Sequence, residues 1–351
     1  MRDRITGIDL RRVTTPLREP FATSRGALDV LASVEFTLIT DGSPPVNGWA
    51  TPATRITGET LESLEAALSG PLSERVRGVP LDEPDALLER LHSCAPANAV
   101  ARAALDIAIH RLLAMRAGRT LTAALCGAEA IRLDTDVTVS ADTPAVMVAG
   151  AIARVSAGFR TLKLKVGGLP DPEDETARVL SVRAAVPQEV NLRLDANQAW
   201  QPSFAAAVLD RLALADVAIE FIEQPVLAAD LAGLAWVRQR SRYPVMADES
   251  VATSADVERV ADLGAADLIN IKLAKAGGIR PSLAAIDTAR SAGLPCMFGC
   301  LLEMPGNVAA AAALAAGTSW PGSHDLDAGW WLRRPDDVHV SYSPPSVTAH
   351  G

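Results

Sequence analysis

The sequence predicts an α/β protein in which a TIM-type barrel of repeated strand–helix units follows a separate α+β unit. From about residue 132, short apolar strands alternate with alanine-rich helices, and matching points on successive strands recur every 24 to 30 residues. Such a step holds one strand, one helix and two short loops. Seven or eight units in about 200 residues favour a closed barrel over a doubly wound sheet. No GxGxxG motif follows a strand, which argues against a dinucleotide-binding fold.

The region before the repeats predicts strands first and helices second. Residues 1–60 contain two segments of alternating apolar and polar residues separated by turn residues, "ITGIDLRRVTT", "VLASVEFTLIT" and the turn "DGSPPVNG". From about 58 to 117 the apolar residues recur every three to four positions, most clearly in "ANAVARAALDIAIHRLLAMRAG". That helix is expected to end at Gly118, a residue suited to a helix C-cap.

Composition limits the classes of function. The chain has 351 residues, 49% of them apolar, a formal net charge of -9 and a pI near 5.2. An acidic chain lacks the basic patch that nucleic acid requires and is repelled by anionic membranes, so we expect neither partner. Four cysteines without a CxxC pair argue against a disulfide framework. With no signal peptide and no apolar run near the ~20 residues of a bilayer span, we expect a soluble, cytoplasmic protein. We also expect a homo-oligomer that acts on a small molecule.

Charged residues end the successive apolar strands of the predicted barrel. Catalytic groups of TIM barrels lie at the carboxyl ends of the strands, so these side chains are candidates for an active site. In chain order they are Lys163, Lys165, Asp195, Glu223, Asp248 and Lys272.

The order of these charges predicts a metal site with a base on either side. Three carboxylates at one barrel mouth repel one another unless a cation lies between them, and oxygen ligands suit Mg²⁺. No His or Cys ends these strands, which makes zinc a poorer candidate. Lys163 and Lys165 are two apart on a strand and point to one face, where like charge and a metal favour loss of a proton. Lys272 approaches from the opposite side.

Each of these residues also has a plain interpretation. An aspartate after a strand commonly caps a helix, and a pair of lysines commonly lies on a solvated edge. A barrel used only as a binding scaffold is a further alternative, and it predicts that both lysines are dispensable. The joint order, spacing and strand position of the charges favour catalysis, because many charges in a barrel mouth are costly without a reaction to perform.

The chain resembles the muconate-lactonizing subgroup of the enolase superfamily over most of its length. The resemblance implies a modified (β/α)7β barrel over residues 126–329 and an α+β capping domain over 1–125, completed by a tail at about 330–351. It also implies Mg²⁺ ligands at Asp195, Glu223 and Asp248, acid/base lysines at Lys165 and Lys272, and an assisting Lys163. The strings that carry it are "TLKLKVGG", "RLDANQAW", "EFIEQPV", "VMADES" and "INIKLAKAGG".

The string "HDLDAGWWL" favours one activity within the subgroup. Asp325 and Asp327 are two apart on the last expected barrel strand and so face the same way, where two carboxylates suit an ammonium group. This resembles the DxD motif of dipeptide epimerases and implies an isomerase that inverts the α-carbon of the C-terminal residue, for example in L-Ala-L-Glu. A turn capped by aspartate is the plain interpretation. An N-succinylamino acid racemase or o-succinylbenzoate synthase remains the alternative, since both use the same metal and lysines.

Three further residues match substrate-contacting regions of the family. Arg25, in the loop "ATSRGALD", is similar to an arginine that binds the side-chain carboxylate of a C-terminal Glu. Thr138 lies on the first barrel strand, and Glu303 follows the seventh. The chain departs from the family pattern at "GWAT" over 48–51, where a glutamate is usual, and at "AGWW" after the DxD. Both departures bear on which side chain is accepted, and neither touches the metal or the bases.

Overall fold

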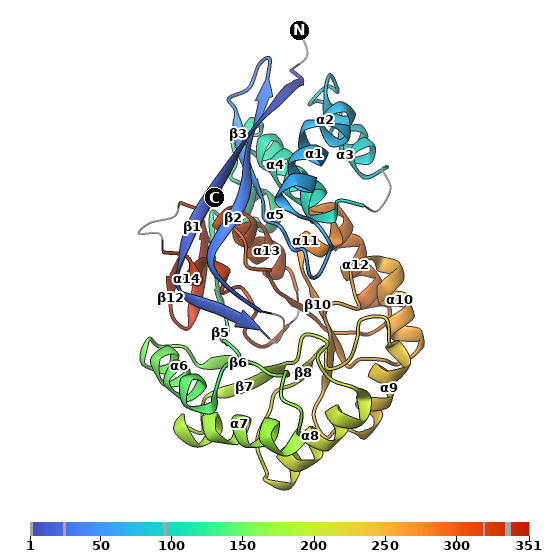
Figure 1. The fold of residues 1–351 in the computed structure, drawn as a ribbon. Helices are drawn as coiled ribbons and strands as arrows, with labels where there is room; N and C mark the ends of the chain where they lie inside the picture. Colours follow the sequence, from blue (N-terminus) through green and yellow to red (C-terminus); the bar gives the residue numbers. More distant parts are fainter. Residues whose placement is uncertain (1–2, 24–25, 94–96, 319, 334–337, 351) are drawn as a thin grey trace.

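The computed structural model describes residues 3–23, 26–93, 97–318, 320–333 and 338–350 (Figure 1). It contains a three-stranded antiparallel sheet in the order β1-β2-β3, a seven-stranded parallel sheet running in sequence order from β5 to β11, and a small sheet in the order β12-β13-β4. Figure 1 shows the first sheet and its helices stacked above the barrel, whose helices form the outer ring.

The N-terminal unit has the predicted order of strands followed by helices. The two long strands pair over most of their length, and the predicted central helix ends within two residues of Gly118, which adopts a positive φ of 68°. The elements are β1 (Ile5–Thr23), β2 (Gly26–Thr40), β3 (Val46–Ala50), α1 (Leu61–Ser69), α2 (Pro71–Val76), α3 (Pro84–His92), α4 (Ala99–Arg116) and α5 (Leu121–Cys126).

The barrel unit follows as alternating strands and helices, as predicted. Its strands are β5 (Val137–Val139), β6 (Thr161–Lys165), β7 (Asn191–Asp195), β8 (Ile222–Glu223), β9 (Val245–Ala247), β10 (Leu268–Ile271) and β11 (Cys296–Phe298). Its helices are α6 (Pro144–Ser156), α7 (Pro172–Ala185), α8 (Pro202–Leu214), α9 (Leu231–Arg240), α10 (Ser254–Asp262), α11 (Leu273–Ala276), α12 (Ile279–Ser291), α13 (Pro305–Ala315) and α14 (Ala328–Trp331).

The sheet closes through residues 324–325, which act as an eighth strand. His324 forms a parallel bridge with Thr135 beside β5, and Asp325 forms one with Gly299 beside β11. The amide of Asp325 donates to the carbonyl of Phe298 at 2.9 Å. One short segment thus joins both edges of the parallel sheet, which confirms the predicted barrel and places Asp325 at its seam.

Local sequence sets where the barrel helices begin. Pro144, Pro172 and Pro202 occupy the first turn of their helices, where a missing N–H costs nothing. Thr253 and Asp256 form a reciprocal capping box at the start of α10. These starts fix the short loops that follow the strand ends and therefore hold the charged residues in place.

Two apolar cores meet beneath α4. The strands β6 and β7 are buried almost throughout inside the barrel core, while β2, β3 and the helices α1–α4 enclose the second core. Ala274 of α11, on the barrel side, belongs to the second core. The N-terminal unit therefore packs directly on the helix that follows β10.

The C-terminal strands pair within the barrel side of the molecule. The strand β13 (Ser346–His350) lies between β12 (Val340–Ser343) and β4 (Ala130–Asp134). Val347 and Ala349 belong to the barrel core. The domain limits given above remain a prediction. No helix in the described part of the chain has both the length and the apolar character needed to span a bilayer.

Candidate active site

The register of the parallel sheet brings the predicted charged residues to one end of the barrel. Lys165 lies opposite Asp195 in the β6–β7 pair, and Asp195 lies opposite Glu223 in the β7–β8 pair. Asp248 follows β9 by one residue, and Lys272 directly follows β10. All five side chains therefore stand at the carboxyl ends of consecutive parallel strands, where TIM barrels hold their chemistry.

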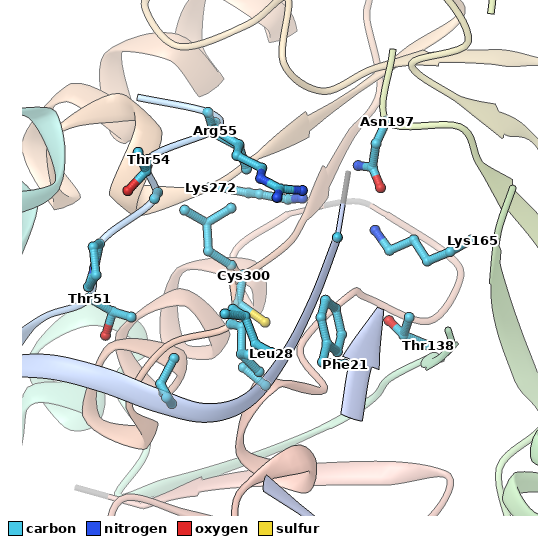
Figure 2. Close-up of a pocket in the computed structure, with 18 of the residues that line it drawn as sticks. Phe21, Leu28, Thr51, Thr54, Arg55, Thr138, Lys165, Asn197, Lys272 and Cys300 are labelled. Carbon is cyan, nitrogen blue, oxygen red and sulfur yellow. The ribbon is translucent and has the colours of Figure 1, made fainter. Parts of the chain in front are cut away.

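The two predicted acid/base lysines contact the carboxylates from opposite sides. Lys165 Nζ is 2.5 Å from Asp195 Oδ2, and Lys272 Nζ is 2.9 Å from Asp248 Oδ2 and 3.9 Å from Glu223 Oε1. All of these residues are buried. In Figure 2 Lys165 and Lys272 reach the cavity from different sides. A substrate held between them would present one face to each amine.

The electrostatics of this cluster differ in one respect from the expectation. Burial opposes protonation of Lys272, but the Asp248 and Glu223 carboxylates outweigh it and raise the pKa of Lys272 well above its ordinary value. The lowering of pKa expected for the Lys163–Lys165 pair is also not seen at Lys163: burial opposes protonation there, but the Asp325 and Asp136 carboxylates outweigh it and raise the pKa of Lys163 well above its ordinary value. Burial, followed by the neighbouring Asp195 charge, raises the pKa of Glu223 to about 8.

Two residues that the sequence reasoning missed support the cluster. Lys275 is buried, and its Nζ contacts both the carboxylate and the backbone oxygen of Asp248. Asn270 Nδ2 donates to Glu223 Oε1 at 2.7 Å. Asn270 is two residues before Lys272 and so shares its face of the strand, a signal that the alternation of β10 already contained.

The residues present fit a divalent cation in their chemistry. Among the described residues no three His, Cys, Asp or Glu side chains are placed to hold a metal as they stand, since the lysines contact the carboxylates. Glu223 Oε2, however, is buried without a hydrogen-bond partner, although a buried carboxylate oxygen ordinarily has one. Carboxylate oxygens from three adjacent strands are the ligand type that Mg²⁺ prefers. Asp195, Glu223 and Asp248 are therefore the donors that such an ion would use.

A cavity of about 430 Å³ lies over this cluster, and both structural units line it. The barrel contributes Lys163, Lys165 and Lys272, and the N-terminal unit contributes Phe21 and Leu28 from the β1–β2 hairpin, together with the loop after β3. Figure 2 shows Phe21 and Leu28 beside Thr138 and Cys300 at one side of this space. The barrel therefore supplies the lysines and carboxylates of the cavity, and the N-terminal unit supplies part of its wall.

The two aspartates of the DxD segment lie in the cavity wall. Lys163 Nζ is 2.5 Å from Asp325 Oδ2, and Lys272 Nζ is 3.7 Å from the same oxygen. Asp327 Oδ2 accepts hydrogen bonds from the Thr138 amide at 2.8 Å and from the Trp331 indole at 3.0 Å. The DxD segment therefore adjoins Lys163 and Lys272 as well as the first barrel strand.

The remaining predicted contact residues differ in their positions. Thr138 is buried and lines the cavity. Glu303 lies outside the set of lining residues, where its carboxylate accepts from the Leu301 amide at 3.3 Å and from Asn307 Nδ2 at 3.1 Å. Burial raises the pKa of Glu303 to about 7. Arg25 is outside the described residues, so its role in binding remains a prediction.

Arg55 is a cation at the cavity mouth that no motif indicated. It lies in the loop after β3, a few residues beyond the unusual string "GWAT", and it lines the cavity. Figure 2 shows its side chain directed into the pocket. A Cβ added to Gly26, which has a φ of 134°, would come within 2.5 Å of Arg55 Nη2. Glycine at that position therefore leaves room for the guanidinium. The position of Arg55 thus depends on Gly26, and this dependence is visible only in the packing of the two segments.

A barrel with acidic and basic strand ends beneath a capping α+β unit is the architecture of the enolase superfamily. The family model described as enolase C-terminal domain-like matches residues 146–348, and the chain belongs to this superfamily.

The similar curated proteins and solved structures include several epimerases. The chain is 38% identical over 334 residues to an L-Ala-D/L-Glu epimerase of Clostridium acetobutylicum, covering 95% of this chain and 92% of that protein. It superposes on a substrate-liganded L-Ala-D/L-Glu epimerase from Bacillus subtilis with a TM-score of 0.93 at 35% identity, covering 99% and 96% of the two chains. A dipeptide epimerase from Enterococcus faecalis V583, complexed with Mg and L-Leu-L-Tyr, gives 0.91 at 34% identity, covering 99% and 97%. The prediction of an isomerase is thereby confirmed.

Proposed function

We propose that the protein is a magnesium-dependent dipeptide epimerase that inverts the α-carbon of the C-terminal residue. The observation that carries the proposal is the position of the DxD segment: Asp325 lies 3.7 Å from Lys272, while Lys165 stands across the carboxylate cluster. One cavity thus offers amines on two sides and anionic oxygens beside one of them. The dipeptide substrates of the similar epimerases described above agree with such a site.

The substrate carboxylate is the group that a cation at Asp195, Glu223 and Asp248 would hold. When bound, Mg²⁺ supplies positive charge that stabilises the enolate formed after loss of the α-proton. The carboxylates hold their positions through protein contacts, since Asn270 donates to Glu223 and Lys275 contacts Asp248. Phe21, Leu28 and Leu31 of the β1–β2 hairpin add apolar surface to the wall of the cavity in which the reacting carbon would lie.

The proton transfer uses the two lysines in turn. For one enantiomer, the neutral amine of Lys165 or Lys272 removes the α-proton, and the ammonium group of the other lysine returns a proton to the opposite face. Lys163, which is buried beside Lys165 on β6, adds a fixed positive charge near the developing negative charge. Chirality at the α-carbon is inverted, and the roles of the two lysines exchange for the reverse reaction.

The other end of the substrate lies toward the DxD segment and the mouth. An N-terminal ammonium group suits the anionic wall formed by residues 325–327, whereas a succinyl group would bring a second carboxylate to that wall. A C-terminal acidic side chain suits a cation at the mouth, for which Arg55 and the predicted Arg25 are the candidates. An L-Ala-L-Glu-like dipeptide is therefore our proposed substrate type.

Proton NMR in D₂O tests this assignment directly. The protein with Mg²⁺ is incubated with a dipeptide library, a panel of N-succinylamino acids and the o-succinylbenzoate synthase substrate. Exchange of the α-proton of the C-terminal residue with inversion is expected for dipeptides. Exchange confined to the N-succinyl panel, or turnover of the synthase substrate alone, would overturn the proposal. The predicted cytoplasmic homo-oligomer is a separate expectation, which sedimentation of the purified protein and localisation of a tagged chain would check.

A further inference from the structure

A buried ion pair on α7 has no part in the proton transfer described above. Glu175 lies in the first turn of α7 and is fully buried, and Arg178, one turn further along the helix, is 4% exposed. Their side chains form both an ion pair and a hydrogen bond. The attraction between two buried charges repays their lost hydration only when further hydrogen bonds satisfy both groups. The remaining partners of this pair therefore indicate its role.

The Glu175–Arg178 pair binds both polar groups of one backbone residue. The Gly167 amide donates to Glu175 Oε2 at 3.0 Å, and Arg178 Nη2 donates to the Gly167 carbonyl at 3.1 Å. Gly167 has a φ of 97°, a conformation that glycine adopts readily and other residues adopt rarely. Two buried side chains thus fix the turn by which the chain leaves β6.

This turn directly follows one of the two proposed bases. Lys165 is the last residue of β6, and a single residue separates it from Gly167. The pairing of β6 with β5 ends at Leu164, one residue before Lys165, whereas on the other side Lys165 still lies opposite Asp195 of β7. The sheet therefore supports Lys165 from the β7 side, while its support from β5 ends earlier.

Arg178 provides a connection on the β5 side. Its Nη1 donates at 3.4 Å to the carbonyl of Asp142, in the loop after β5, while its Nη2 holds Gly167. The guanidinium presents its donors in a rigid planar fork, so this side chain sets the spacing between the two loops. One buried arginine thus joins the loops that follow the strands of Thr138 and Lys165, both of which line the cavity.

We propose that Glu175 and Arg178 are positioning residues for Lys165, which hold the turn after β6 and thereby fix the direction in which the Lys165 amine enters the cavity. The inference rests on the proposed epimerase function and gives a role to a buried pair that the mechanism leaves unused. A displacement of about 1 Å can lower a rate about a hundredfold, because a base must lie within reach of the proton that it removes. Since Lys272 reaches the cavity from a different side, loss of this support should impair the reaction on one face of the substrate.

A purely structural role is the alternative, and α7 offers a matched control. Arg183 is also buried on α7, and it also donates to backbone carbonyls, those of Val186 and Val190 at the other end of the helix. Arg178→Lys and Arg183→Lys each keep a positive charge and lose the planar fork. Both variants should lose some stability in thermal unfolding, but only Arg178→Lys alters the turn after Lys165.

Deuterium exchange in D₂O separates the two faces. The substrates are both epimers, at the C-terminal residue, of the L-Ala dipeptide that the wild type exchanges fastest, and Lys165→Ala shows which epimer depends on Lys165. Arg178→Lys should slow exchange of that epimer about tenfold and change exchange of the other by less than about threefold. Arg183→Lys should show no asymmetry. Equal slowing of both epimers, unchanged exchange, or the same asymmetry in Arg183→Lys would overturn the inference.

A second comparison removes the buried carboxylate. Glu175→Gln keeps the side-chain length and an acceptor for the Gly167 amide but leaves Arg178 without its counter-charge, whereas Glu173→Gln makes the same change at an exposed position in the same turn. Glu175→Gln should reproduce the asymmetry, and Glu173→Gln should leave exchange of both epimers unchanged. A symmetric response to Glu175→Gln would overturn the inference alone. A wild type that exchanges no dipeptide would overturn the proposed function and this inference with it.

Discussion

Every lysine at the barrel mouth is buried and paired with a carboxylate. Lys163, Lys165, Lys272 and Lys275 are each about 5% exposed or less. A buried charge persists only when an opposite charge compensates its lost hydration. Removing one partner of such a pair leaves the other buried without a counter-charge. At the residue scale, each substitution in this cluster therefore alters both a reaction and a local charge balance, and experiments need readouts that separate the two.

The two-base assignment predicts separable losses. Lys165→Ala and Lys272→Ala should each lower epimerisation by about 10²–10⁴-fold, the usual contribution of one acid/base group. Each variant should still exchange the α-proton of one enantiomer with solvent, because one face keeps its base. Polarimetry measures epimerisation, and proton NMR in D₂O measures exchange for each enantiomer. Full epimerase turnover in both variants would show that these lysines are not the bases.

The guanidinium at the cavity mouth predicts a side-chain preference. Arg55→Met keeps length and removes charge, so kcat/KM on L-Ala-L-Glu should fall about tenfold, the smaller end of the range for an exposed charged contact. Activity on L-Ala-L-Leu should be unchanged or higher. Arg25→Met, assayed on the same two substrates, shows which of the two arginines carries the preference. A uniform fall on both dipeptides in Arg55→Met would mean that Arg55 holds the loops rather than the substrate.

At the element scale, three consecutive strands each contribute one carboxylate, so the metal site that we propose needs no local motif. We expect Asp195→Asn, Glu223→Gln and Asp248→Asn each to lower kcat by about 10²-fold or more, because charge stabilisation of the developing anion is a large catalytic term. Saturating Mg²⁺ should raise the Tm of the wild type, since an ion bound at 100 times its Kd adds about 2.7 kcal/mol, and these variants should lose that increase. Full activity after exhaustive chelation would contradict the metal assignment.

A buried carboxylate, Asp106, joins α4 to the start of α12. Asp106 is fully buried, its Oδ1 accepts from the Ile279 amide at 2.6 Å and its Oδ2 is 2.7 Å from His92 Nε2. A Cβ on Gly278 would come within 2.5 Å of this carboxylate, so the close approach requires glycine. The helix of the N-terminal unit thereby positions the segment after Lys272.

This contact predicts a pH-dependent stability. Burial opposes protonation of His110, but the Asp106 carboxylate outweighs it and raises the pKa of His110, so this stabilisation is complete below the ordinary histidine pKa near 6.5 and is lost as pH rises through the folded value. Burial raises the pKa of Asp106, but His110 and His92 outweigh it and lower that pKa below its ordinary value. The stabilisation that the ionised Asp106 provides is therefore lost as pH falls in acid. Asp106→Asn should cost about 1–3 kcal/mol at pH 5.5 and flatten the decline toward pH 8.5 in urea unfolding. An equal loss at both pH values would refute the linkage to His110.

At the scale of the whole molecule, neither structural unit contains a complete site. The barrel holds the lysines and carboxylates, but Phe21, Leu28 and Arg55 of the N-terminal unit line the same cavity. Ala274, just after Lys272, packs into the core of the N-terminal unit. We propose that residues 1–125 cap a barrel over 126–329, and these contacts make the cap a part of the catalytic enclosure.

The tail provides a test of which core it completes. Val347 is fully buried in the barrel core, and Thr348, next to it on β13, points to the other face and is only half-buried. Val347→Asp should abolish cooperative folding because an unpaired charge enters an apolar core, whereas Thr348→Asp should cost about 1 kcal/mol or less. Urea unfolding followed by circular dichroism compares the two. A normal transition in Val347→Asp would show that the tail is accessory to the barrel.

Sequence alone determined the repeat, the strand ends and the candidate chemistry of this protein. These follow from chemistry that is local along the chain: apolar periodicity defines strands and helices, and Lys165, Asp195 and Lys272 interrupt buried strands in which a charge needs a reason. The order of the strands in a barrel then follows, because consecutive β/α units pair as neighbours.

Tertiary structure alone decided which partners the aspartates of the DxD segment take and which cation reaches the cavity. The pairing of Asp325 with Lys163, the donation from the Thr138 amide to Asp327 Oδ2 and the approach of Arg55 to Gly26 join residues that are between 29 and 189 positions apart. No local pattern encodes such contacts, because the direction of a side chain depends on packing against elements distant in sequence. Periodicity placed both aspartates on one face, and only packing gave one of them a lysine and the other a tryptophan.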